Sequence, residues 1–505
     1  MSAAPKIDAP MTAMTKSDQT FSKEQEAFFS WVSSRKASDG ESALVVSVAG
    51  SGKTTAVAEA ARRKKDKGTV AYFTFGKVAV AELERRLPAG SKVQTLHGLA
   101  LGALHKMGHV EVDKEKGIRI AKAVERFDYK RRRVLMRAIG LAKNSLCETK
   151  RDVRRLLHAS EFFVPGGKEN ETAFVADVVE ALSISLEDAG NVDFDDMVWF
   201  AARSEEARPR TYDWIVVDEG QDTNPAQIVV LGRAVAKGGR IVVVGDPKQA
   251  VYQFRGATSG AMGELMEAAG GVDPKEFRFP LSYRASKAVA AYVRKETTVE
   301  DFRALEDAPE GSVTFQSEER ASSLLAGGWA PGDFVISRTN APLVEHGLKA
   351  LAQGIPATLL GRGLGEQLKF FVEGFPGTTA AEVMRGAATW LSEETAVLQE
   401  SGESTAGAED RFRCLQVLAE GVKTKEEIVA RIDCLFRDDG FASEKQIAFS
   451  TIHQAKGLER DRVFVLRSSF GRGIETEADE NLWYVAITRS KRDLILVGDF
   501  GSEEE

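Results

Sequence analysis

The sequence predicts an α/β protein with two parallel-sheet domains, each interrupted by a mainly helical insertion. Short apolar runs rich in β-branched residues alternate with helical patterns, and such runs are typical of central strands in a parallel sheet covered by helices. Four runs come before residue 250 and four after residue 330, which predicts two separate sheets. The eight predicted strands are Ala43–Val48, Thr69–Phe73, Trp214–Val217, Ile241–Val244, Phe334–Ile336, Ile447–Thr451, Val463–Leu466 and Leu494–Val497.

Two long segments with helical periodicity and no strand pattern separate these runs. They indicate insertions into the two sheet domains. We expect a first domain at 21–101 and 189–282 with a basic insertion at 102–188, and a second domain at 283–364 and 441–500 with a reduced insertion at 365–440. Residues 1–20 are expected to be a disordered tail.

Composition limits the class of protein. The chain has 505 residues, and 43% of them are hydrophobic and 28% charged, as in ordinary globular proteins. No apolar stretch approaches the ~18 residues of a membrane span, and the first twenty residues lack a secretory pattern. We therefore expect a cytoplasmic protein without a membrane partner. The three cysteines, Cys147, Cys414 and Cys434, form no close pair, which favours reduced thiols over a zinc site or disulfide framework.

Charge is distributed unevenly. The net charge is −7, which excludes attraction of nucleic acid to the whole surface. Residues 121–160 nevertheless hold 12 Lys and Arg against 4 Asp and Glu, including Arg131, Arg132 and Arg133. A solvated helical face is one interpretation of this stretch. Contact with nucleic-acid phosphates is the interpretation we favour for a basic cluster in an acidic protein.

A glycine-rich loop directly follows the first predicted strand and precedes a helical run. Gly50 and Gly52 allow backbone N–H groups to surround a phosphate, Lys53 can reach the outer phosphate oxygens, and Thr54 can bind Mg²⁺. Ser47 stands where the general pattern has its first glycine. The order of strand, loop and helix predicts a site for ATP with Mg²⁺.

Polar residues also follow the last two predicted strands of this domain. Asp218 and Glu219 come at a strand end, where open α/β sheets bind ligands. We expect Asp218 to hold Mg²⁺ and Glu219 to polarise the attacking water. Gln249 follows the next strand and is placed to sense the terminal phosphate. Together with the glycine loop, these residues predict an ATPase.

The segment that follows Gln249 contains two aromatic residues and an arginine, for which two interpretations are open. Tyr252, Phe254 and Arg255 can be part of the core, as aromatic side chains often are. Alternatively, the aromatic rings can stack on nucleic-acid bases.

The ordered motifs resemble those of superfamily 1 DNA helicases of the UvrD/Rep type, with similarity to F-box DNA helicases in residues 245–257. The resemblance spans residues 21–498. It rests on residues 21–25 (FSKEQ), 74–79 (TFGKVA), 95–100 (TLHGLA), 283–284 (YR), 451–459 (TIHQAKGLE) and 484–489 (YVAITR), in the order of that family.

The resemblance implies two RecA-like motor domains and a role for each matching residue. Nucleotide binding is expected from Gln25, Gly50, Ser51, Gly52, Lys53, Thr54, Thr55, Tyr283 and Glu459, and catalysis from Lys53, Asp218, Glu219, Gln249, Arg284 and Arg489. Arg284 and Arg489 would act as arginine fingers from the second domain. DNA contacts are expected from Phe75, Thr95, His97, Tyr252, Phe254, Arg255, Thr451 and His453, besides the basic cluster.

The resulting hypothesis is an ATP hydrolase that translocates on single-stranded DNA, 3′ to 5′ by resemblance, and unwinds tailed duplexes. The alternative is an ATP-switched factor that displaces proteins from DNA without processive unwinding, which the reduced second insertion favours. The biological pathway, the protein partners and the oligomeric state stay open, although a monomer is plausible.

Overall fold

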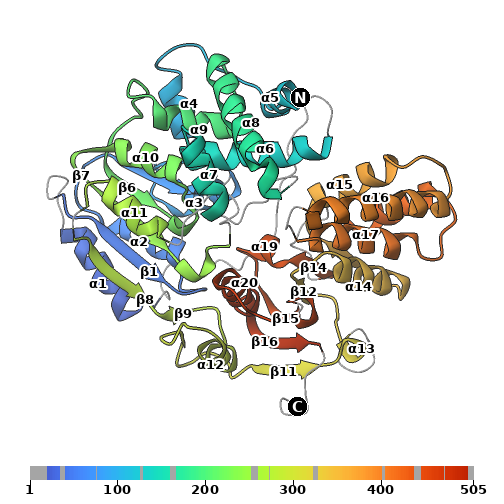
Figure 1. Ribbon diagram of the computed structural model, residues 1–505. Helices are drawn as coiled ribbons and strands as arrows, with labels where there is room; N and C mark the ends of the chain where they lie inside the picture. Colours follow the sequence, from blue (N-terminus) through green and yellow to red (C-terminus); the bar gives the residue numbers. More distant parts are fainter. Residues whose placement is uncertain are drawn as a thin grey trace.

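The computed structural model describes residues 20–34, 40–74, 77–125, 129–159, 167–251, 260–271, 273–321, 328–400, 404–436, 445–470 and 473–498. Its core consists of two six-stranded sheets in which every strand pair is parallel. Figure 1 shows the two sheets as neighbouring halves, with helices α5–α8 above the first and helices α15–α17 beside the second. The predicted fold class is confirmed.

The first sheet has the strand order β3-β2-β6-β7-β1-β8. Its strands are β1 (Ala43–Ser47), β2 (Val70–Thr74), β3 (Lys92–Thr95), β6 (Tyr212–Val217), β7 (Val235–Gly245) and β8 (Lys275–Phe279). The helices that follow these strands or lie beside the sheet are α1 (Lys23–Ser34), α2 (Lys53–Arg63), α3 (Lys77–Arg86), α4 (Leu96–Leu104), α9 (Phe194–Arg203), α10 (Pro225–Ala234) and α11 (Ala261–Ala268). Crossover helices of this kind are what parallel strands require.

Helical segments also make up most of the first insertion. It contains α5 (Lys116–Val124), α6 (Tyr129–Asn144), α7 (Lys150–Ala159) and α8 (Gly167–Glu187), with the two-residue strands β4 (Glu111–Val112) and β5 (Asn191–Val192) paired at its base. Two buried lysines, Lys116 and Lys143, share the carboxylate of Asp196 on α9 at 2.8 Å each. These ion pairs hold α5 and α6 on α9.

The second sheet has the order β11-β16-β15-β12-β14-β13. Its strands are β11 (Ser312–Gln316), β12 (Phe334–Ser337), β13 (Ala357–Leu359), β14 (Ile447–Thr451), β15 (Arg460–Leu466) and β16 (Ser490–Val497). Its helices are α12 (Lys287–Glu296), α13 (Glu318–Ala321), α14 (Ala341–Ala352), α19 (Ile452–Ala455) and α20 (Glu477–Ile487). The second insertion consists of α15 (Arg362–Glu373), α16 (Ala380–Glu400), α17 (Ala406–Ala419) and α18 (Lys425–Leu435).

All eight predicted strands are present, and they are the central strands of the two sheets. The four longer strands that the apolar-run criterion missed, β3, β8, β11 and β13, are the edges of those sheets. Strand β8, for example, alternates exposed and buried residues at its end and carries two charged side chains outward, Glu276 and Arg278. Edge strands of this type do not give a continuous apolar run.

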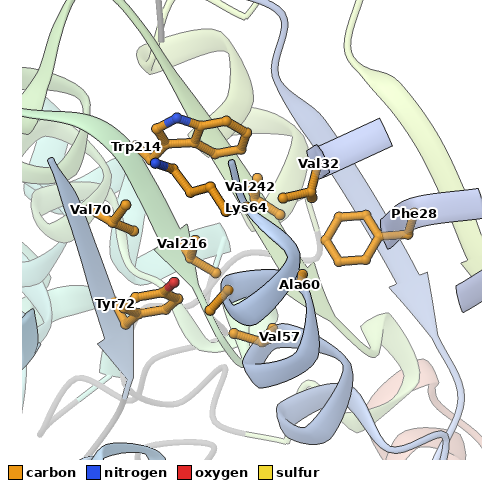
Figure 2. Close-up of a pocket in the computed structure, with 11 residues that line it drawn as sticks. Phe28, Val32, Val57, Ala60, Lys64, Val70, Tyr72, Trp214, Val216 and Val242 are labelled. Atoms are coloured by element: carbon orange, nitrogen blue, oxygen red, sulfur yellow. The ribbon is translucent and has the colours of Figure 1, made fainter. Parts of the chain in front are cut away.

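Helices α1 and α2 pack on one face of the first sheet around a small cavity of about 20 Å³ (Figure 2). Phe28, Tyr72 and Trp214 line it together with valine and alanine side chains, and Lys64 is the one charged residue among them. A space of this size and lining is a packing gap of about one water molecule, not a ligand site. Among the described helices, none combines the length and hydropathy of a membrane span.

Candidate nucleotide and DNA site

The glycine loop lies between the two halves of the molecule. Gly50 and Gly52 both have φ of 73°, a left-handed conformation that favours glycine. A Cβ atom on Gly50 would lie 2.6 Å from the side chains of both Ser282 and Arg284. The backbone N–H of Tyr283 also donates to the Gly50 carbonyl at 2.8 Å. Glycine is therefore required here both by the loop conformation and by the close approach of residues 282–284.

Charged and hydroxyl side chains gather at the carboxyl ends of β1 and β6. Lys53 Nζ lies 3.9 Å from Glu219 Oε1, and the Thr54 hydroxyl donates to Asp218 Oδ2 at 2.9 Å. Glu219 has φ of 58°, a strained conformation for a residue with a side chain, and Gln221 Nε2 donates to its carboxylate at 2.6 Å. The structure thus brings the predicted residues Lys53, Thr54, Asp218 and Glu219 together at one sheet edge.

The two carboxyl groups have opposite pKa shifts. Burial, reinforced by the negative charge of Glu219, raises the pKa of Asp218 to about 6. Burial also acts to raise the pKa of Glu219, but the charges of Lys53 and Lys456 outweigh it and lower that pKa. Glu219 is therefore the carboxylate that stays charged when Asp218 takes up a proton.

Residues 246–249 connect this edge with the second half. Gln249 Nε2 donates to Asp246 Oδ2 at 2.6 Å, and the Tyr484 hydroxyl donates to the same oxygen at 3.1 Å. Tyr484 in turn accepts the backbone N–H of Ala49 at 2.9 Å. Arg489 Nη2 lies 3.4 Å from Gln249 Oε1. Gln249 of the first half thus contacts Arg489 of the second half.

Arg284 and Arg489 both point toward the interface between the halves. Arg284 forms an ion pair with Glu459 and donates to the Thr488 carbonyl at 3.1 Å. Arg489 is 1% exposed and donates to the Val485 carbonyl at 2.8 Å. Burial, followed by the charge of Arg284, lowers the pKa of Arg489 to about 9, so it remains a cation at neutral pH.

Two of the predicted nucleotide-binding residues, Gln25 and Tyr283, form one hydrogen-bonded group with the glycine loop. The Tyr283 hydroxyl donates to Gln25 Oε1 at 2.6 Å, and Gln25 Nε2 donates to the Ser51 carbonyl at 3.0 Å. Glu459, also expected to bind the nucleotide, pairs with Arg284 and with Lys491 at 3.2 Å. Thr55 accepts from Arg86 at 2.9 Å and faces away from this group.

The loop residues fit a triphosphate. The Ser51 hydroxyl is buried and has no hydrogen-bond partner within the described part of the chain. With Lys53 and the N-terminus of α2 beside it, this is a donor set suited to phosphate oxygens. Thr54 and Asp218 supply the oxygen ligands that Mg²⁺ prefers.

A second polar site lies at the carboxyl ends of β12 and β14. Thr451 and His453 line an open cleft of about 370 Å³ together with Arg338, Asn340, Leu364, Gln367 and Gln454. Sequence reasoning missed Arg338 and Asn340. They come two and four residues after the predicted strand Phe334–Ile336, so the strand-end rule that identified Asp218 applies to them too.

The predicted DNA residues of the first half lie apart from this cleft. Thr95 caps α4 by accepting the Gly98 N–H at 3.1 Å. The His97 ring lies 6.0 Å from the ring of Phe194, and burial lowers the pKa of His97. Phe194, a residue that sequence reasoning also missed, is 52% exposed at the start of α9.

The basic cluster is partly engaged within the insertion. Arg131 lies 2.9 Å from Glu125 and also pairs with Asp177, while Arg132 donates to the Glu125 carbonyl at 3.1 Å. Phe75, Tyr252, Phe254, Arg255 and the side chain of Arg133 lie outside the described residues.

Comparison with known proteins places this geometry in a family. The model of the UvrD/REP helicase N-terminal domain matches residues 33–269, and that of the UvrD-like helicase C-terminal domain matches residues 426–498. The chain belongs to the UvrD/Rep helicase family. In this UvrD/Rep chain, the first matched region contains Lys53, Asp218 and Gln249. The second matched region contains Arg489.

Relatives of this UvrD/Rep chain are named as helicases. It is 26% identical to F-box DNA helicase protein 1 of Schizosaccharomyces pombe over 90% of this chain and 55% of the relative. It is 29% identical to the ATP-dependent DNA helicase UvrD1 of Mycobacterium bovis and 27% identical to the ATP-dependent DNA helicase PcrA of Leuconostoc citreum. Those two matches cover 44% and 42% of this chain, and 33% and 32% of the relatives. The chain therefore spans about half of the first relative and a third of the others.

Proposed function

We propose that this protein is an ATP-driven motor that moves along single-stranded DNA and separates duplexes, with 3′-to-5′ polarity. The observation that carries the proposal is the division of one phosphate site between two halves: Lys53, Thr54 and the carboxylates come from the first, and Arg284 and Arg489 come from the second. Hydrolysis at such a site depends on the relative position of the halves, which is how ATP turnover can produce movement.

The residues have distinct roles in the proposed reaction. Lys53 and the N–H groups of the loop bind the phosphates of ATP, and Thr54 and Asp218 hold Mg²⁺, which neutralises developing charge when bound. Glu219, which stays ionised beside Lys53, orients the attacking water and accepts its proton. Arg284 and Arg489 stabilise charge on the transferred phosphoryl group. Gln25 and Tyr283 recognise the adenine base.

DNA binding is proposed for the cleft at the carboxyl ends of β12 and β14. Arg338, Asn340, Thr451 and His453 provide the cation and neutral donors that bind backbone phosphates without reading sequence. We also propose Phe194 beside His97 as a stacking surface, because an exposed aromatic ring suits unpaired bases. Tyr252 and Phe254 keep their predicted stacking roles. These contacts support single-stranded DNA and tailed duplexes as the partners.

A panel of nucleic acids tests the proposal. ATPase turnover and strand displacement are measured with single-stranded DNA, with 3′-tailed, 5′-tailed and blunt duplexes, and with matched RNA. The motor predicts stimulation by single strands and displacement of 3′-tailed duplexes above the others. Stimulation without displacement would favour the alternative, a remodelling factor. That alternative is supported by the reduced second insertion, whose described residues form the helices α15–α18. An unstimulated, inactive protein would contradict both.

A further inference from the structure

Helix α20 lies between the two sites and contacts residues of both. Its eleven residues, Glu477–Ile487, span about 16 Å at the usual rise per residue. Asp479 lies in its first turn, toward the DNA cleft, whereas Tyr484 lies in its last turns and is followed by Arg489 at the nucleotide site. In Figure 1, α20 is on the side of the second sheet that faces the first half.

The DNA-cleft end of this helix is joined to the cleft by one ion pair. Arg338 Nη1 lies 2.7 Å from Asp479 Oδ1. The Arg338 side chain is 36% exposed and lines the cleft with Thr451 and His453, whereas the Asp479 side chain is only 11% exposed. The same guanidinium therefore faces a carboxylate of α20 on one side and the open cleft on the other.

The other oxygen of Asp479 is built into the helix. Oδ2 accepts the Thr476 hydroxyl at 2.8 Å and the Thr476 N–H at 3.2 Å, and the Asp479 N–H donates back to the Thr476 hydroxyl at 3.1 Å. This reciprocal arrangement is a capping box, which fixes the first turn of a helix. A change in the interaction made by the Asp479 carboxylate therefore acts directly on the start of α20.

The next residues of α20 contact the segment that contains Gln249. Lys248 Nζ lies 4.0 Å from Glu480, and Asn481 Nδ2 donates to the Ala250 carbonyl at 3.4 Å. About one turn further, Tyr484 donates to Asp246. Contacts along one helix thus connect the Arg338 ion pair with residues 246–250.

We propose that Arg338 and Asp479 form a displaceable ion pair that couples DNA binding to nucleotide binding, a proposal that rests on the proposed function. A backbone phosphate in the cleft competes with Asp479 for the guanidinium, which binds phosphate as readily as carboxylate. The first turn of α20 then loses an anchor when DNA is bound, and the contacts of α20 with residues 246–250 change with it. Asp479 is a positioning residue in this scheme, because it acts through Arg338 and α20.

Substitution Asp479→Asn tests the coupling, because asparagine keeps the shape and an acceptor for Thr476 but removes the charge that holds Arg338. The dissociation constant of a fluorescent oligothymidine is measured with and without a non-hydrolysable ATP analogue. Without nucleotide, we expect the variant to bind DNA about two- to fivefold more tightly, the factor that a partly exposed ion pair is worth. The ratio of the two dissociation constants, which measures coupling between the sites, should move toward one.

Two further variants complete the experiment. Arg338→Gln should weaken DNA binding and also bring the ratio toward one, so the proposal can be tested even if Asp479→Asn does not fold. Glu345→Gln, which removes an exposed ion pair with Lys349 on α14, should change neither quantity.

A folded Asp479→Asn protein with wild-type DNA affinity and ratio would show that Asp479 is only a helix cap and overturn the proposal. Failure of the proposed function is distinct, because the wild-type protein itself would then show no DNA-stimulated ATPase.

Discussion

At the residue scale, the nucleotide site holds one lysine against an acidic pair. Lys53 is 9% exposed, and its ammonium group forms an ion pair with Glu219. Lys53→Ala should abolish ATP hydrolysis while leaving the fold intact, because the lysine lies in the first turn of α2 with its head at the phosphate site. Turnover and the circular dichroism melting curve are compared with those of Lys349→Ala, an exposed control. Wild-type turnover in a folded variant would contradict the ATPase assignment.

Asp218 makes stability depend on pH in a defined direction. Burial and then the Glu219 charge raise its pKa to about 6, whereas an unfolded chain releases this proton near pH 4. The native state therefore binds more protons between about pH 4 and 6, and stability falls as pH rises through that window.

Asp218→Asn should accordingly melt at a higher temperature than the wild type at about pH 7.5, and the difference should shrink as the pH is lowered toward 5. Asp222, whose pKa burial also raises to about 6, titrates in both proteins and cancels from the difference. Thermal unfolding of both proteins at the two pH values measures the effect. An equal difference at both would mean that Asp218 is ionised throughout.

At the scale of elements, helix α7 of the first insertion carries a group of exposed arginines. Val153 and Leu157 are buried on its inner face, while Arg151, Arg154 and Arg155 are exposed. Arg131 on α6 is paired with two carboxylates and is only 19% exposed, whereas Arg155 on α7 is 82% exposed and lies 3.9 Å from Asp152. We therefore expect DNA contacts of the basic cluster to depend more on α7 than on Arg131.

Replacing Arg151 and Arg155 together by alanine should weaken the salt dependence of single-strand binding. Each lost phosphate contact reduces the slope of log K against log salt by about 0.7. Titrations of labelled DNA at several salt concentrations measure the slope, and Lys295→Ala on α12, at an exposed position with 75% of its side chain accessible, is the control. If the double variant and the wild type have identical slopes, α7 is a solvated face and the cleft beside His453 carries the phosphate contacts.

At the scale of the whole molecule, the proposed ATP hydrolysis requires both halves. Arg284 and Arg489 reach the interface from the second half. In the proposed function they act on the phosphates bound by the loop of the first half. Arg284→Ala and Arg489→Ala should each lower kcat by orders of magnitude, in line with arginine fingers worth about 10³ to 10⁵, with smaller changes in KM. Steady-state kinetics at saturating DNA separates the two parameters. A raised KM with unchanged kcat would assign ground-state binding instead.

The sequence by itself determined the eight central strands, the glycine loop and the carboxylates that follow β6, because a buried parallel strand is apolar on both faces and its ligands follow its carboxyl end. It did not determine the edge strands: exposed positions break the apolar run in β3, β8 and β11, and β13 is only three residues long. It also did not reveal that Glu459 pairs with Arg284, that Arg131 is neutralised by Glu125 and Asp177, or that Arg338 lies beside Asp479. Those pairings join residues far apart in the chain, and only tertiary packing brings their charges within a few ångströms. Local patterns record which strand a residue follows, whereas the partner of its side chain depends on how the two sheets and their insertions are placed.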